Sequence, residues 1–122
     1  MGFCGKWCVM CIVRRFPMRK TSYYTAMALW GAFGVDGKAF TNREGEIALH
    51  KHISGGLSSL RESGVLELAD GRKRSIARRR TEPHPQWRFT HRFAEYMRSH
   101  DGQEEHQIAM AFIEKVGGVP CA

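Results

Sequence analysis

The chain has 122 residues, enough for one compact domain, and its 43% apolar content is ordinary for a globular protein and argues against general disorder. Its net charge of +7 is uneven, because residues 1–98 hold eighteen Lys/Arg against eight Asp/Glu, whereas residues 99–122 hold one against four. The basic balance of residues 1–98 predicts a polyanionic partner. The acidic balance of residues 99–122 predicts a different role for the last helix. No segment approaches the roughly 20 apolar residues of a membrane span, so we expect no membrane partner.

Residues 1–20 are predicted to be a flexible N-terminal leader. Their apolar stretch, residues 3–13, is interrupted by Lys6 and followed by Arg14 and Arg15, the reverse of the order in a secretory signal. We therefore expect a cytoplasmic protein with reduced cysteines. The alternative to a flexible leader is that these residues are an upstream extension and that the natural start is Met18.

Three cysteines of this leader form the pattern Cys-x3-Cys-x2-Cys at Cys4, Cys8 and Cys11. The spacing is similar to the cluster-binding triad of radical S-adenosylmethionine enzymes, in which thiolates converge on an iron–sulfur cluster. That family needs a barrel larger than this chain can form. A structural metal with Cys121 as fourth ligand stays an alternative, although the first histidine is His50. We expect no cofactor.

Two helices are predicted between residues 21 and 50. Thr21 or Ser22 would cap the first, and one buried face is indicated by four residues at helical spacing: Tyr23, Ala26, Met27 and Trp30. The second opens at Thr41-Asn-Arg-Glu44, which matches a capping box, and we expect Ile47 and Ala48 to point inward.

A third helix is predicted from the spacing of Ile53, Leu57 and Leu60, which form one buried edge. Small or hydrogen-bonding residues on the opposite face can reach phosphates and base edges in a major groove. These candidate DNA contacts are Lys51, Ser54, Gly55, Ser58, Ser59 and Arg61. The pair Gly55-Gly56 permits two interpretations: close approach of the backbone to a phosphate, or a turn after which the helix would begin at Leu57.

A basic hairpin follows this helix. Gly64 ends the helix, residues 65–68 alternate as a strand, and Asp70-Gly71 is a hairpin signal. Trp87 and Phe89 point inward from a returning strand after a proline-containing loop at residues 81–85. Six cations on the hairpin are predicted to contact phosphates: Arg72, Lys73, Arg74, Arg78, Arg79 and Arg80.

Residues 41–90 resemble the winged helix-turn-helix domains of small phage and mobile-element proteins. The matching residues are Ile53-Ser-Gly-Gly-Leu-Ser-Ser-Leu60, Gly64-Val65, Gly71-Arg72 and Trp87-Arg88. The resemblance implies an α+β fold, a winged helix-turn-helix with a helical core and a small antiparallel β-hairpin wing, over residues 21–90. The chain departs from the pattern at two points: Gly56 stands where the pattern has a basic residue, and the connection from the second helix is short. Both departures weigh against sequence-specific base reading more than against duplex binding.

Residues 91–122 are predicted to form C-terminal helices. The first covers residues 92–100, and Asp101-Gly-Gln-Glu104 resembles a capping box that opens the second. The second helix carries an apolar stripe: Ile108, Ala109, Phe112, Ile113 and Val116. This stripe either completes the core or pairs with its copy in a homodimer, which the resemblance favours.

We expect no enzyme, because the chain has no phosphate-binding glycine loop and no nucleophile elbow, and His50 and His52 are spaced poorly for a metal. Two functions remain open. The first is a small transcriptional regulator of phage or mobile-element type that binds double-stranded DNA through the third helix and the basic hairpin, which would be the wing. The alternative is a winged-helix adaptor or inhibitor of a nucleoprotein complex, which would bind a protein through the acidic C-terminal helix.

Overall fold

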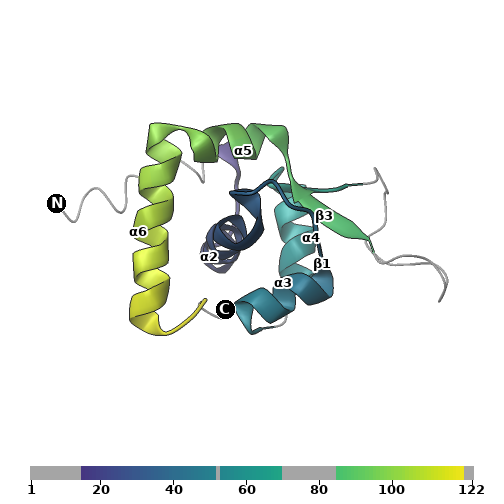
Figure 1. The fold of residues 1–122 in the computed structure, drawn as a ribbon, viewed down its shortest axis with the longest axis horizontal. Coiled ribbons are helices and arrows are strands. Elements are labelled where there is room, and N and C mark those ends of the chain that lie inside the picture. The colour runs from purple at the N-terminus through teal and green to yellow at the C-terminus, as the bar shows by residue number, and fades with distance from the viewer. Residues whose placement is uncertain (1–14, 52, 70–84, 120–122) are drawn as a thin grey trace.

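Helices surround one central helix, and a small sheet lies on one side of the molecule in this computed structural model (Figure 1). The structure describes residues 15–51, 53–69 and 85–119. Within these ranges no helix is both long and apolar enough to cross a bilayer. The same ranges contain five α-helices, a π-helical turn and three strands: α2 (Lys20–Leu29), η1 (Trp30–Gly34), β1 (Phe40–Thr41), α3 (Asn42–Leu49), α4 (Ser54–Glu62), β2 (Leu66–Leu68), β3 (Gln86–Phe89), α5 (His91–Arg98) and α6 (His100–Val116). The predicted α+β class is confirmed.

The central helix is α2, with α6 on one side and α3, α4 and the strands on the other (Figure 1). All four residues predicted for its core face are buried. The predicted cap is wrong, because the N-cap is Arg19. Thr21 lies inside the helix, where its carbonyl accepts from Thr25 Oγ1 at 2.9 Å, and Ser22 is buried.

The helix widens into η1 at its C-terminal end, where Val35 N donates to Trp30 O at 3.1 Å. Gly34 makes this turn possible, since a Cβ there would lie 2.1 Å from Cε3 of the Trp30 ring. The indole therefore packs directly against the backbone.

The predicted capping box of α3 is confirmed: Thr41 N donates to Glu44 Oε1 at 2.9 Å, and Glu44 N donates to Thr41 Oγ1 at 3.2 Å. The predicted inward orientation of Ile47 and Ala48 is wrong, since Ile47 is 62% exposed and Ala48 is exposed too. The helix instead presents Gly45 to the core.

Gly45 faces the core because α3 packs closely against its neighbours there. A Cβ at Gly45 would lie 2.7 Å from Ile53 Cδ1 and 3.5 Å from Leu29 Cδ2, so the absent side chain lets α3 approach both neighbours. Hydrophobic periodicity gives no weight to a glycine, and it therefore assigns the wrong face.

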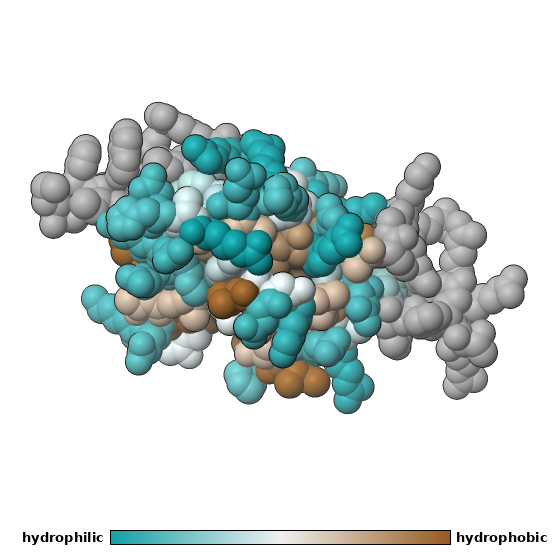
Figure 2. All heavy atoms as spheres, turned by 45° about the horizontal axis from the view of Figure 1, so that its top comes forward, coloured by the Kyte–Doolittle hydropathy of each residue, from teal (hydrophilic) through white to brown (hydrophobic). Residues whose placement is uncertain are grey.

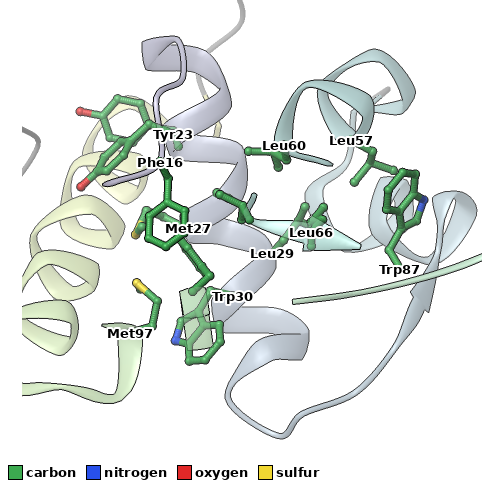
Figure 3. Close-up of a cluster of buried hydrophobic side chains, with 14 of the residues drawn as sticks. Phe16, Tyr23, Met27, Leu29, Trp30, Leu57, Leu60, Leu66, Trp87 and Met97 are labelled. Atoms are coloured by element: carbon green, nitrogen blue, oxygen red, sulfur yellow. The ribbon is translucent and has the colours of Figure 1, made fainter. Parts of the chain in front are cut away.

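The helix α4 contains both Gly55 and Gly56, so the alternative of a turn before Leu57 is wrong. It ends as predicted at Gly64, whose φ is +83°. Val65 N donates to Leu60 O at 2.9 Å and Gly64 N to Arg61 O at 3.1 Å, which is a Schellman motif. Figure 3 shows Leu57 and Leu60 directed into the core beside Leu66 and Trp87.

The sheet is antiparallel with the order β1-β3-β2. Leu68 pairs with Trp87 and Leu66 with Phe89, while Phe40 of β1 pairs with Trp87 on the other side. Leu66, Leu68 and Trp87 are buried, as their alternation predicts. The strand β1 was not expected, because two residues carry no periodicity.

The two C-terminal helices complete the core. The predicted cap at Asp101 is wrong, since α6 begins after Ser99, whose Oγ accepts from Gly102 N at 3.2 Å. In the predicted stripe, Ala109 and Ile113 are buried and the Phe112 ring stacks on Tyr24 of α2 with centroids 4.8 Å apart. The other two residues of that stripe are partly or largely exposed: Ile108 and Val116.

Residues 15–20 of the predicted leader are described; Lys20 already belongs to α2, and another of them belongs to the core. Phe16 is 0% exposed, with its ring edge-on to Phe93 at 5.2 Å. Ser63 Oγ, at the end of α4, donates to Pro17 O at 2.6 Å. The cysteine triad lies outside the described residues.

Candidate nucleic-acid interface

The outer face of α4 is the described part of the predicted DNA interface. Ser58 and Ser59 are exposed because the opposite edge of the helix is buried. The first turn carries no acidic residue, so no carboxylate of that turn offsets the positive end of the helix dipole. A Cβ at Gly56 would meet nothing within 4 Å, so packing does not require this glycine.

The two ends of α4 differ in how well they suit a phosphate. Near the C-terminal end, Arg61 is partly buried and Glu62 is exposed. Glu62 follows Ser58 by four residues and Ser59 by three, so it lies on the same face of the helix as both serines. A carboxylate there repels a phosphate, so the N-terminal half is better suited. Ser54 and Gly55 form its first turn, and their backbone alone is described; Lys51 precedes the helix and is partly buried.

Residues 70–84, which we call the basic connection, join β2 to β3. The described residues on either side of it are held in place, since Ala69 N donates to Gln86 O at 2.8 Å and Trp87 Nε1 donates to Asn42 Oδ1 of α3 at 2.6 Å. The six cations predicted to contact phosphates all belong to the basic connection and lie outside the described residues: Arg72, Lys73, Arg74, Arg78, Arg79 and Arg80.

The far end of β3 is held by the end of α4. Thr90 Oγ1 donates to Gly64 O at 2.7 Å, and Thr90 N donates to Val65 O at 3.0 Å. The same hydroxyl accepts from Phe93 N at 3.3 Å and so caps α5. The helix α4 and the strands β2 and β3 therefore form one hydrogen-bonded unit.

The excess of positive charge falls mainly on residues outside the described ranges. The described ranges contain eleven Lys/Arg and ten Asp/Glu, which nearly cancel, whereas the basic connection contains six Lys/Arg and two Asp/Glu. At the base of the hairpin, Arg88 Nε is already paired with Glu67 Oε2 at 2.6 Å. The body alone therefore gives little attraction for a polyanion.

Sequence reasoning missed a group of arginines that lie over aromatic rings around α5. The guanidinium of Arg92 is 4.8 Å from the Phe16 ring centroid, and that of Arg98 is 5.8 Å from the Trp30 ring. Their partners are far away in the sequence, so no local pattern indicates them. The face seen in Figure 2, with α5 turned toward the viewer, is mainly hydrophilic with apolar side chains between.

Other titratable groups lie away from α4. His106 Nε2 of α6 is 3.0 Å from Met27 O, and burial lowers the pKa of this imidazole while the hydrogen bond partly offsets the shift. In the described ranges, no three His, Cys, Asp or Glu side chains are grouped as metal ligands. The weak metal candidates Cys4, Cys8 and Cys11 lie outside these ranges.

Comparison with known proteins gives no relative: no family model, curated protein or solved structure matches this chain.

Proposed function

We propose that this chain is a winged helix-turn-helix protein that binds duplex DNA with the N-terminal half of α4 and the basic connection. The element order from α2 to β3 and the sheet order β1-β3-β2 are compatible with a winged helix. The resemblance to phage and mobile-element proteins makes a small transcriptional regulator the function we favour. Double-stranded DNA is then its partner.

The observation that carries this proposal is the separation of charge. Six cations belong to the connection between β2 and β3, two strands that pair with each other and whose far end is hydrogen-bonded to the end of α4, and the described residues are otherwise nearly neutral. Keeping like charges together is unfavourable unless an anion neutralises them. Each bound phosphate releases condensed counterions, so this arrangement supports duplex affinity that falls steeply with salt.

The test is a fluorescence-anisotropy titration with a random-sequence duplex at several salt concentrations. The parent should show a log–log salt slope of several units, and the triple substitution Arg78→Ala, Arg79→Ala and Arg80→Ala should flatten it by about one unit for each phosphate that is no longer bound. If the triple variant binds like the parent, the basic connection does not contact DNA.

A second triple variant serves as the control because it removes the same charge from α5 and α6: Arg92→Gln, Arg98→Gln and Lys115→Gln. These side chains lie outside the proposed interface, so the salt slope should stay near that of the parent. An equal reduction of the slope in both triple variants would mean that net charge alone causes binding.

A protein-binding adaptor is the second candidate, and the exposed side of α6 favours it. Ile108 and Val116 are exposed there beside Glu104 and Glu114. An acidic surface with apolar residues suits a protein partner or a second copy of the chain. No affinity for any duplex, together with a stable complex that Val116→Glu abolishes, would establish this candidate instead.

A further inference from the structure

A half-enclosed pocket of about 300 Å³ lies between η1, β3 and α5, away from the outer face of α4. Trp30, Phe89 and Ala94 form its apolar wall. Such a volume is at the lower end of small-molecule sites. The pocket is therefore large enough for a compact organic ligand and too small for a folded partner.

Cations predominate among the polar groups of this pocket. Lys38, Arg88 and Arg98 line it together with His91, and Glu67 supplies the one carboxylate. That carboxylate is already engaged by Arg88 at 2.6 Å. Lys38 and Arg98 thus leave the pocket with an excess of positive charge, which favours an anionic ligand.

The wall of the pocket is shaped by two glycines. Gly34 allows the Trp30 ring to pack against the backbone, and Gly37 has a φ of +69° with open space where its Cβ would be. The Arg98 guanidinium, 5.8 Å from the Trp30 ring centroid, places a cation beside an aromatic wall. A ligand with a ring and an acidic group would find a partner for each part.

We propose that this pocket binds a small organic anion in which a carboxylate or phosphate is attached to a planar ring. The ring packs against the side of Trp30 and Phe89, and the anion is bound by Arg98 and Lys38. Planar rings gain from contact with aromatic side chains, and charge-assisted hydrogen bonds are roughly twice as strong as neutral ones. This site does not depend on the DNA-binding proposal.

The test is an NMR titration of the full-length protein with three probes. Indole-3-carboxylate carries both features, indole-3-carboxamide carries the ring without the charge, and inorganic phosphate carries the charge without the ring. The carboxylate should shift the amide signals of Gly37, Lys38 and Ala94 saturably. The other two probes should bind about tenfold more weakly, as removal of one charge-assisted hydrogen bond implies.

Two variants distinguish binding in the pocket from binding to other basic side chains on the surface. Arg98→Gln should weaken indole-3-carboxylate binding by about tenfold, whereas Lys115→Gln, an exposed cation at the end of α6, should leave it unchanged. Equal weakening by both variants, no saturable shift, or equal binding of the carboxamide would overturn the proposal. So would a short DNA duplex that produced the same shifts and displaced the probe, since the surface would then be a DNA contact.

Discussion

At the scale of single residues, two helical glycines that look alike in the sequence have opposite roles. Gly56 in α4 has open space where its Cβ would be, whereas a Cβ at Gly102 in α6 would lie 2.0 Å from Tyr96 O. Packing therefore requires Gly102 and leaves Gly56 unexplained. A role for Gly56 in letting the helix backbone approach DNA is a hypothesis that substitution can test.

We expect Gly56→Ala to stabilise the protein by about 1 kcal/mol, because alanine is the better helix former and its methyl group meets nothing. The same variant should bind duplex more weakly if the backbone lies close to a phosphate. Urea unfolding and anisotropy titration measure the two effects. Stabilisation with unchanged DNA binding would remove Gly56 from the interface.

Gly102→Ala is the matched comparison, and here we expect destabilisation of at least about 1–3 kcal/mol. The added methyl group must displace backbone at the junction of α5 and α6 rather than the end of a flexible side chain. Urea unfolding of the two alanine variants in parallel checks the opposite signs. A Gly102→Ala protein as stable as the parent would show that the helix junction can open to accept a side chain.

His106 is the residue at which we expect stability to depend on pH. Burial lowers its pKa, so at intermediate pH the folded chain binds fewer protons than the unfolded chain. The stability that His106 contributes is therefore present above its unfolded pKa of about 6.5 and is lost as pH falls below that value. His106→Gln, which keeps a donor near Met27 O, should lose less stability between about pH 7.5 and about pH 5.5 than the parent.

Urea titrations of the parent and of His106→Gln at both pH values measure the two free energies of unfolding and check the predicted difference. His100→Gln is the control because that side chain is exposed. If the free energy of unfolding depends on pH in the same way in the parent and in His106→Gln, His106 is not the source of the pH dependence.

At the scale of elements, the proposed interface depends on the described residues on either side of the basic connection. The Trp87 indole is buried, and its N–H is satisfied by Asn42 of α3 at 2.6 Å. We expect Asn42→Ala to cost about 1–3 kcal/mol, since a largely buried donor would lose its partner. The amide of Ala69, bonded to Gln86 O, should also exchange faster with solvent.

Hydrogen exchange and urea unfolding measure these effects, and Glu67→Gln provides the comparison. The Arg88–Glu67 pair is at a similar position along the hairpin, but both side chains are about half exposed, so its loss should cost less than about 1 kcal/mol. If both variants behave alike, the Trp87 hydrogen bond does not hold the hairpin.

Elements with strong local signals could be predicted from the sequence. The capping box at Thr41, the buried edge at Leu57 and Leu60, and the glycine end at Gly64 all depend on neighbours within a few residues. The strand β1 could not be predicted, because Phe40 pairs with Trp87 from a distant part of the chain.

The candidate site was predictable to a smaller extent. The exposure of Ser58 and Ser59 follows from helix periodicity, and it is confirmed. The mispredicted orientation of Ile47 depends on a glycine contact between helices, which periodicity ignores. The pocket beside Trp30 combines η1, β3 and α5, and such convergence is a tertiary property that no local pattern encodes.

At the scale of the whole molecule, the core and the excess of charge belong to different parts of the chain. The described ranges are nearly neutral and enclose α2, while the excess of cations falls in the connection between β2 and β3. A partner with a regular array of phosphates would contact this connection and α4 together. The helix α6 lies on the other side of α2 in Figure 1, away from α4.

The most direct measurement places a photo-crosslinking amino acid at Ser58 on α4 or, as a control, at Gln107 on α6, both of which are exposed. In the presence of a DNA duplex, we expect crosslinks from position 58 and not from position 107. The crosslinks from position 58 should weaken when Arg78, Arg79 and Arg80 are replaced with alanine, because fewer phosphates are then bound. Crosslinks from position 107 alone, or crosslinks from position 58 that are as strong without the three arginines, would contradict a joint interface of α4 and the basic connection.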